Sequence, residues 1–136
     1  MLARREHSEQ ELCRKLIARG FDVEYVPDVV TELKQKGLQS DHRFTDSYIT
    51  SRIGKGSGPL RIAQELRQRG VADEIIEETM LGHKQEWRDQ LEAVREKKFG
   101  KEVPASYKER AKQSRFLQYR GFSSDQIREL FRAVNE

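Results

Sequence analysis

The sequence predicts an all-α protein built as an elongated array of three tandem three-helix repeats. Apolar residues recur at spacings of three and four, with little strict alternation. The dipeptide Arg-Gly returns at 19–20, 69–70 and 120–121 in similar surroundings. Charged residues make up 36% of the 136 residues, above the usual quarter, and so much polar surface favours a thin structure over one large core.

The repeat depends on the positions that flank each Arg-Gly pair. A small residue stands seven positions before the glycine and leucine four before it, and apolar residues stand one, six and ten positions after it. Copy by copy, these residues are Cys13, Leu16, Phe21, Val26 and Val30; Ala63, Leu66, Val71, Ile76 and Met80; and Ser114, Leu117, Phe122, Ile127 and Phe131. We interpret each copy as a helix that ends at glycine as its left-handed C-cap, a short turn and a second helix. The apolar residue after glycine is expected to fold back onto the first helix.

In the first unit, residues 1–37, Ser8 and Glu11 form a capping-box pattern at the start of a helix that ends at Gly20. The next helix contains Pro27, which is tolerated only in a first turn, so we expect this helix to begin near Glu24. Only MLARREH precedes the first cap. We therefore expect the leading helix of this unit to be truncated.

In the second unit, residues 38–83, we expect a leading helix over 41–53, a second helix from Pro59 to the cap at Gly70, and a third over 72–80. Proline suits a first helical position because its missing N–H would have no partner there. The apolar side of the leading helix consists of Phe44, Tyr48, Ile49 and Ile53.

The segment GKGSG, residues 54–58, has the glycines and lysine of a phosphate-binding loop. A Walker loop, however, needs Gly-x-x-x-x-Gly-Lys-Ser/Thr between a strand and a helix. Here Lys55 lies between glycines and helices are predicted on both sides. We interpret the segment as a tight turn between two helices.

In the third unit, residues 84–136, the leading helix is predicted over 84–100. Its inward positions at successive turns are Trp87, Leu91 and Val94 or Arg95. The capping patterns Ser106 with Glu109 and Ser123 with Gln126 mark the starts of the other two helices. We interpret the single tryptophan as a core residue.

The sequence offers no catalytic or metal-binding pattern. The histidines His7, His42 and His83 lie far apart, and with Cys13 they do not form a metal-ligand spacing. No Ser/His/Asp grouping follows from spacing, and most carboxylates lie beside lysine or arginine on helix faces. We therefore expect a binding protein without a cofactor and without enzymatic activity.

Basic residues are concentrated in the third unit of a chain with net charge +3. Residues 1–37 carry seven bases and seven acids, residues 38–83 six and seven, and residues 84–136 thirteen and nine. Such a strip, together with the bases around the glycine loop, is a candidate contact to a polyanion or an acidic protein surface; the alternative is an ordinary solvated face. The candidate contact residues are Arg52, Lys55, Arg61, Lys97, Lys98, Lys101, Lys112, Arg115 and Arg120.

Helix–Gly–helix units also allow a second interpretation, an independent DNA-binding module of helix-turn-helix type. The last helix of the second unit opposes it, because four acids and no base would face the phosphates. In the third unit Arg128 and Arg132 keep this alternative open.

The sequence also gives an expectation of where in the cell the protein is found. The chain has no run of 18 apolar residues, its start lacks an apolar stretch of signal-peptide length, and a single cysteine fits a reducing compartment. We expect a cytoplasmic protein, with a monomer as the default state.

Three stretches resemble the RecX family, regulators of the bacterial recombinase RecA. They are HSEQELCRKL (7–16), GLQSDHRFTDSYITSRIGKGSGPLRIAQELRQRG (37–70) and RFLQYRGFSSDQI (115–127). In the second and most specific stretch the matching positions are Gly37, Asp41, Arg43, Phe44, Tyr48, Ile49, Arg52, Lys55, Gly56, Gly58, Pro59, Arg61, Ile62, Leu66 and Gly70. Members of that family are also built of tandem three-helix repeats.

The resemblance implies a protein that binds the groove of the RecA–single-stranded DNA filament. It implies inhibition of the filament's ATPase, strand exchange and co-protease activities, and a place in DNA repair, homologous recombination and the SOS response. Weak binding to single- or double-stranded DNA is compatible with that role. The candidate contact to a basic RecA surface is the acidic set Asp73, Glu74, Glu77 and Glu78.

Overall fold

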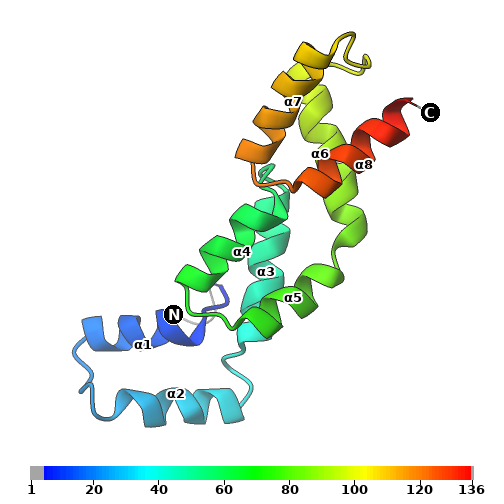
Figure 1. Ribbon diagram of the computed structural model, residues 1–136. Helices are drawn as coiled ribbons and strands as arrows, with labels where there is room; N and C mark the ends of the chain where they lie inside the picture. Colours follow the sequence, from blue (N-terminus) through cyan, green and yellow to red (C-terminus); the bar gives the residue numbers. More distant parts are fainter. Residues whose placement is uncertain (1–4, 136) are drawn as a thin grey trace.

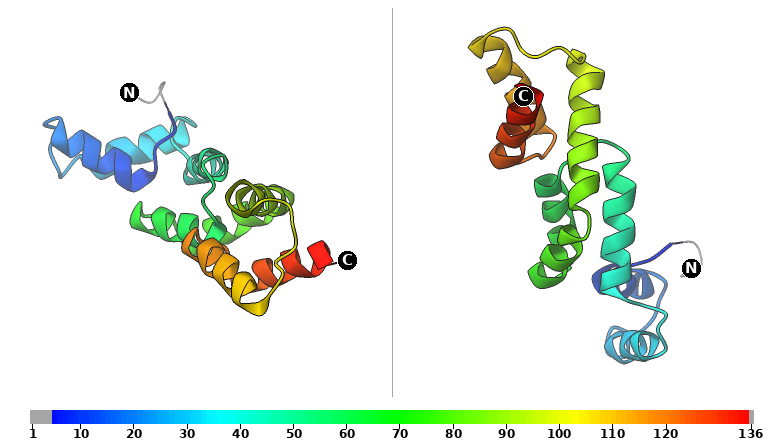
Figure 2. Two further views of the ribbon diagram at one scale, coloured as in Figure 1. Left: turned by 90° about the horizontal axis from the view of Figure 1, so that it is seen from above. Right: turned by 90° about the vertical axis from the view of Figure 1, so that its right-hand side faces the viewer.

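The computed structural model describes residues 5–135, which form eight α-helices and no strand (Figure 1). The helices are α1 (Glu9–Ala18), α2 (Val26–Gln35), α3 (Asp41–Ile53), α4 (Pro59–Gln68), α5 (Asp73–Leu81), α6 (Lys84–Phe99), α7 (Tyr107–Tyr119) and α8 (Ser124–Asn135). Unit one contains α1 and α2, unit two α3 to α5, and unit three α6 to α8. The units follow one another along an elongated body, as Figures 1 and 2 show, and the predicted fold class is confirmed.

Unit one has two helices in the described part of the chain. Residues 5–8 lead into α1 without helical structure. Part of the segment that we predicted as a truncated leading helix, residues 1–4, lies outside the described residues. Helix α2 begins at Val26, two residues later than expected near Glu24, with Pro27 in its first turn. The delay has a local cause, because the Asp22 carboxylate accepts the Glu24 N–H at 3.1 Å and holds the preceding residues in a turn.

The predicted capping boxes form at two of three sites. Ser8 with Glu11 makes both reciprocal hydrogen bonds. Ser123 with Gln126 also makes both, at 2.8 and 3.1 Å. At Ser106 only the hydroxyl bond to the next turn forms, because the Glu109 carboxylate instead accepts from an amide one turn further along α7.

The three Arg-Gly pairs end α1, α4 and α7 as predicted. Gly20, Gly70 and Gly121 have φ values of +96°, +82° and +104°, a conformation that favours glycine. The next residue donates its N–H back to the leucine carbonyl of the same repeat in each case, at 3.1 or 3.2 Å. Burial differs, however: Val71 and Phe122 are buried, whereas Phe21 is 52% exposed. Phe21 corrects our expectation because no third helix covers it in the described part of unit one.

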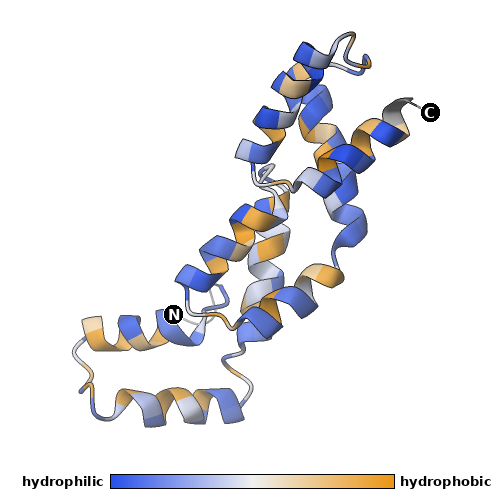
Figure 3. Ribbon diagram, in the orientation of Figure 1, coloured by the Kyte–Doolittle hydropathy of each residue, from blue (hydrophilic) through white to orange (hydrophobic). Residues whose placement is uncertain are grey.

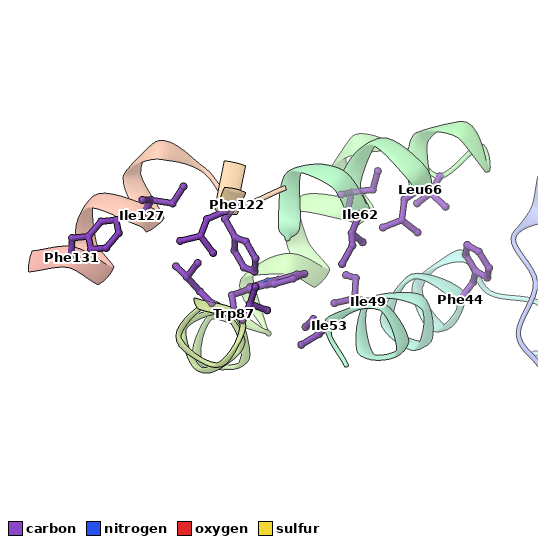
Figure 4. Packing of buried hydrophobic residues seen from close by; sticks show 14 residues of the cluster. Phe44, Ile49, Ile53, Ile62, Leu66, Trp87, Phe122, Ile127 and Phe131 are labelled. Carbon is purple, nitrogen blue, oxygen red and sulfur yellow. The ribbon is translucent and has the colours of Figure 1, made fainter. Parts of the chain in front are cut away.

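Units two and three share one hydrophobic core (Figure 4). Trp87 of α6 lies between Phe122 of unit three and Ile53 of unit two in Figure 4, so the cluster runs without a break from α3 to α8. Figure 3 shows hydrophobic residues recurring along the helices among a larger number of hydrophilic ones. Val94 and Arg95, the alternatives for an inward position, are both buried. Unit one has a separate, smaller cluster made of Leu12, Leu16, Val26 and Val30.

Units two and three meet where the start of α4 contacts the end of α7. The Gly58 N–H donates to the Arg120 carbonyl at 2.7 Å, and the Leu60 N–H donates to the Gly121 carbonyl at 2.9 Å. The first N–H and last C=O groups of a helix have no partner within it, so here the two helix ends satisfy each other. Their dipoles also meet with opposite signs. We call Gly58, Arg120 and Gly121 the glycine joint.

Glycine is required on both sides of this joint. A Cβ atom on Gly58 would lie 2.3 Å from the carbonyl carbon of Gly121, and a Cβ atom on Gly121 would lie 2.5 Å from the Cβ of Arg61. Both distances are well inside van der Waals contact. The third glycine of the GKGSG segment therefore serves a close approach between two helix ends.

Units one and two meet through the corresponding helix ends but with polar side chains. The Ser8 hydroxyl, at the start of α1, donates to the Arg69 carbonyl at the end of α4 at 2.9 Å. The Glu9 N–H donates to the Asp41 carboxylate at 2.8 Å. We call these contacts the polar joint. Because the two cores are separate clusters, this joint depends on hydrogen bonds, each contributing about 1 kcal/mol net.

The glycine joint predicts a contrast between two alanine substitutions in the same loop. Gly58→Ala should lower the free energy of unfolding by about 3 kcal/mol, because the added methyl forces two backbones apart. Gly54→Ala is the control, since its Cβ would meet Ser51 O at an ordinary 3.6 Å, and its effect should stay within about 1 kcal/mol. Urea denaturation followed by circular dichroism measures both. Equal stabilities would contradict the joint.

Buried His7 predicts a pH dependence of stability. Its Nε2 lies 3.1 Å from the Lys15 ammonium, which can only donate, so the ring is neutral. Burial, followed by the charges of Arg5 and Lys15, lowers the pKa of His7. In the unfolded chain His7 binds a proton near pH 6.5, whereas the folded protein binds it only at lower pH, so stability falls as pH falls through this window.

The measurement compares urea midpoints at pH 7.5 and 5.5 for wild type, His7→Gln and His42→Gln. His7→Gln should reduce the loss of stability at the lower pH, and His42→Gln is the control that removes an exposed imidazole. An unchanged loss in His7→Gln would show that His7 does not cause it.

Candidate functional site

The nine basic residues selected from the sequence fall into four places. Lys55, Arg61 and Arg120 lie at the glycine joint, and Lys97, Lys98 and Lys101 lie at the end of α6 or just after it. Lys112 and Arg115 lie on α7, and Arg52 lies on α3. Seven of them are exposed, and Arg52 and Arg120 are half-buried. The structure thus keeps most of the set available to a partner and gives these two arginines internal contacts.

Two of these cations are fixed against an aromatic ring. The Lys98 ammonium lies 5.5 Å, and the Arg120 guanidinium carbon 5.6 Å, from the centroid of the Phe116 ring. Phe99 packs edge-on against the same ring, with 5.4 Å between centroids. Cations are attracted to the face of an aromatic ring, so this arrangement positions both charges. We call Lys98, Phe99, Phe116 and Arg120 the basic–aromatic cluster.

The basic–aromatic cluster borders the glycine loop of unit two. A Cβ atom on Gly56 would lie 3.6 Å from a terminal nitrogen of Arg120, so the guanidinium lies alongside this loop. Lys55 is the exposed residue directly before Gly56. One surface therefore carries Lys55, Arg120 and Lys98, where unit two meets unit three.

The glycine loop has no amide left to cradle a phosphate. The N–H groups of Lys55, Gly56 and Ser57 donate to carbonyls at the end of α3, and that of Gly58 donates across the glycine joint. A phosphate-binding loop works by presenting such N–H groups to its ligand. What the loop offers a polyanion is instead the side chain of Lys55 and the cations beside it.

Arg52 belongs to an internal network between α3 and α4. Its guanidinium carbon lies 5.0 Å from the centroid of the Tyr48 ring, and that of Arg69 lies 4.8 Å from it. The Tyr48 hydroxyl donates to Glu65 at 3.0 Å, and Glu65 also lies 3.8 Å from Arg52. Burial raises the pKa of Tyr48, so its hydroxyl remains a donor at neutral pH. The network ties α3 to α4 and makes Arg52 less available than Lys55.

The acidic set on α5 is exposed but partly paired within the chain. Asp73 accepts from Arg67 at 2.7 Å, and Glu78 lies 3.9 Å from His42. Glu74 and Glu77 are the exposed acids for which the structure records no such pair. The structure places this set on unit two.

Two further features bear on chemistry. His83 is buried between the carboxylates of Asp46 and Glu86, at 2.8 and 3.0 Å, and so joins α3 to the start of α6. A groove of about 550 Å³ lies between α6 and α8, lined by apolar residues such as Leu130 and by charged residues such as Arg88. Within residues 5–135, no three His, Cys, Asp or Glu side chains are placed to hold a metal ion. No helix in that range is long and apolar enough to cross a bilayer.

The last helix is poorly suited to a DNA groove. Arg128, one of the two bases that kept the helix-turn-helix alternative open, pairs with Asp125 on the same helix. Glu129 adds a second carboxylate to this exposed face and pairs with Arg88 at 3.3 Å. The face thus combines both signs of charge, whereas DNA presents a row of phosphates.

Sequence reasoning missed Phe99 and Phe116 as members of the site. The available signal was local: Phe116 precedes Arg120 by four residues, which places both on one helix face. The contact between Phe116 and Lys98 joins two different helices, so residue spacing in the sequence could not indicate it.

Comparison with known proteins covers the whole chain. Family models match residues 1–37 as the first three-helix domain of RecX, residues 40–80 as the second and residues 85–131 as the third. A "Regulatory protein RecX" of Halorhodospira halophila is 48% identical over 136 residues, which is 100% of this chain and 84% of the relative. One of Legionella pneumophila is 42% identical over 134 residues, covering 98% of this chain and 89% of the relative.

The fold is also found in solved structures. The crystal structure of RecX from Lactobacillus salivarius superposes with a TM-score of 0.85 at 21% identity, covering 98% of this chain and 89% of that one. A second structure, of "regulatory protein RecX", gives a TM-score of 0.79 at 22% identity and covers 97% of this chain and 66% of that one.

Proposed function

The chain belongs to the RecX family, and from that premise we propose that it is a negative regulator of the RecA recombinase. It binds in the groove of the helical filament that RecA forms on single-stranded DNA. There it inhibits the filament's ATPase, strand exchange and co-protease activities. It works in the cytoplasm as a monomer, without a cofactor and without chemistry of its own.

The observation that carries the proposal is the exposed basic surface on the shared core of units two and three. Lys55 and Arg61 border the glycine joint, next to the basic–aromatic cluster. A surface of this charge attracts DNA phosphates or acidic protein surface in the filament. Because the shared core fixes the backbone that carries these bases, only their side chains have to become ordered on binding.

Inhibition follows from binding to one arrangement of the filament. An elongated body that contacts neighbouring RecA protomers stabilises the relative position it fits. Any step of the ATP cycle that needs another position is then opposed by the difference in binding free energy between the two states. The acidic residues of α5, Glu74 and Glu77 among them, are the proposed contact to a basic RecA surface.

The proposal predicts the effect of charge reversal on RecA's ATPase. The rate of ATP hydrolysis on single-stranded DNA should fall as the wild-type protein is added below one copy per protomer. Lys55→Glu with Arg61→Glu should raise the half-inhibiting concentration roughly tenfold or more, since two attractive contacts become repulsive. Lys97→Glu with Lys98→Glu tests the end of α6 in the same way.

The control is Lys34→Glu with Lys36→Glu, which changes the net charge equally in unit one, at the last turn of α2 and the residue that caps it. Its half-inhibiting concentration should stay within about twofold of the wild-type value, which corresponds to a change of about 0.4 kcal/mol in binding free energy. Each variant must keep the wild-type circular dichroism spectrum. A wild-type protein that leaves the hydrolysis rate unchanged contradicts the proposal.

Binding to DNA in the absence of RecA separates the proposal from an independent DNA-binding module. We expect weak binding to fluorescently labelled single- and double-stranded DNA at 150 mM salt, and a steep loss of it as salt rises. Adding RecA and ATP should increase the amount of this protein bound to the single strand by orders of magnitude. Tight RecA-independent binding that Arg128→Ala with Arg132→Ala abolishes would favour the helix-turn-helix alternative.

A further inference from the structure

Four large apolar side chains are exposed between the last turn of α1 and the start of α2. Ile17 is 42% exposed, Phe21 52%, Val23 63% and Tyr25 62%. They lie within nine residues, at the end of unit one that points away from α4 in Figure 1. We call these four residues the apolar tip. Single exposed apolar residues are ordinary on a protein surface, but a group of this kind marks an interaction site.

The repeat shows what the fold itself needs at these positions. Ile17 and Val23 correspond to Arg67 and Asp73 in unit two, which form an ion pair at 2.7 Å. They correspond in unit three to Gln118 and Ser124, which are hydrogen bonded at 3.1 Å. Units two and three thus place a solvent-exposed polar pair where unit one has an exposed apolar pair.

Phe21 is also more exposed than the apolar residues at the same position in units two and three. Val71 and Phe122 stand at this position of the repeat and are buried in the shared core. Phe21 lies outside the small cluster of unit one and is half exposed. Packing within the described part of the chain therefore accounts for neither the apolar pair nor the position of Phe21.

We propose that the apolar tip is an anchor that inserts into an apolar hollow on the surface of a RecA protomer in the filament. This inference rests on the proposed function and adds an apolar contact on unit one to the charged contacts on units two and three. The two contacts differ in chemistry: the basic surface binds through charge, and the tip binds through burial of apolar area.

The size of the tip favours a filament protomer over a second copy of this chain. Four side chains that are each about half exposed offer on the order of 400 Å². A stable pair of proteins usually buries about 800 Å² on each partner, so contact between two tips falls short of a stable dimer. As part of an interface that already includes the basic surface, the same area is enough for a few dominant contacts.

The test replaces the apolar pair by the polar pair that unit two already carries at the same positions. Ile17→Arg with Val23→Asp should keep the fold, because the repeat accommodates that ion pair in unit two. The matched control is Gln118→Arg with Ser124→Asp, which gives unit three the ion pair of unit two at the same positions of the repeat. Binding of fluorescently labelled protein to preformed RecA–single-stranded DNA filaments is measured by anisotropy at several salt concentrations, and self-association by sedimentation.

We expect Ile17→Arg with Val23→Asp to weaken filament binding roughly tenfold or more, with an unchanged salt dependence, and the control to bind within about twofold of wild type. Lys55→Glu with Arg61→Glu should instead reduce the salt dependence. Wild-type affinity in a folded tip variant overturns the anchor while leaving the proposed function intact. If wild type itself does not bind the filament, the proposed function and the anchor both fail. A wild-type dimer that the tip substitutions make monomeric would identify a second copy as the occupant and contradict the proposal.

Discussion

Two helix ends that satisfy each other's backbone groups hold this molecule in its extended form. At the glycine joint, free N–H groups at the start of α4 meet free carbonyls at the end of α7, at 2.7 and 2.9 Å. The approach is possible only because neither Gly58 nor Gly121 has a Cβ atom. The contact orients unit three relative to unit two, and Trp87 and Phe122 can then complete a core that crosses the boundary. The exposed bases around the joint owe their relative positions to the same contact.

The boundary between units one and two uses the same helix ends with different chemistry. Ser8 takes the place that glycine has at the other joint, and hydrogen bonds replace a continuous core. Such a boundary depends on a few groups, including a buried neutral histidine whose protonation opposes folding. Units two and three thus share a continuous core, whereas unit one keeps its own small core and meets unit two largely through polar contacts. The apolar tip lies on unit one.

The sequence was a good guide where local chemistry decides the structure. The span of α3, the glycine caps of α1, α4 and α7, and the inward faces of α3 and α6 follow from periodicity and capping residues that lie close together in the chain. The contacts between units could not be predicted from the sequence. Nothing in the spacing links Gly58 to Gly121 or Lys98 to Phe116, because such pairs depend on how whole helices meet. For the same reason the half-buried position of Arg52, stacked on Tyr48, and the exposure of Phe21 appeared only in the structure.

The central claim is that an extended helical array regulates RecA by lying along its filament, with charge and apolar burial acting at different units. Electron cryomicroscopy of RecA–single-stranded DNA filaments with this protein bound tests that claim most directly. We predict elongated density in the filament groove, with the bases of units two and three facing DNA or acidic RecA surface and the turn between α1 and α2 in contact with a protomer. Filaments with an empty groove, or density only on DNA that RecA has left, would contradict it.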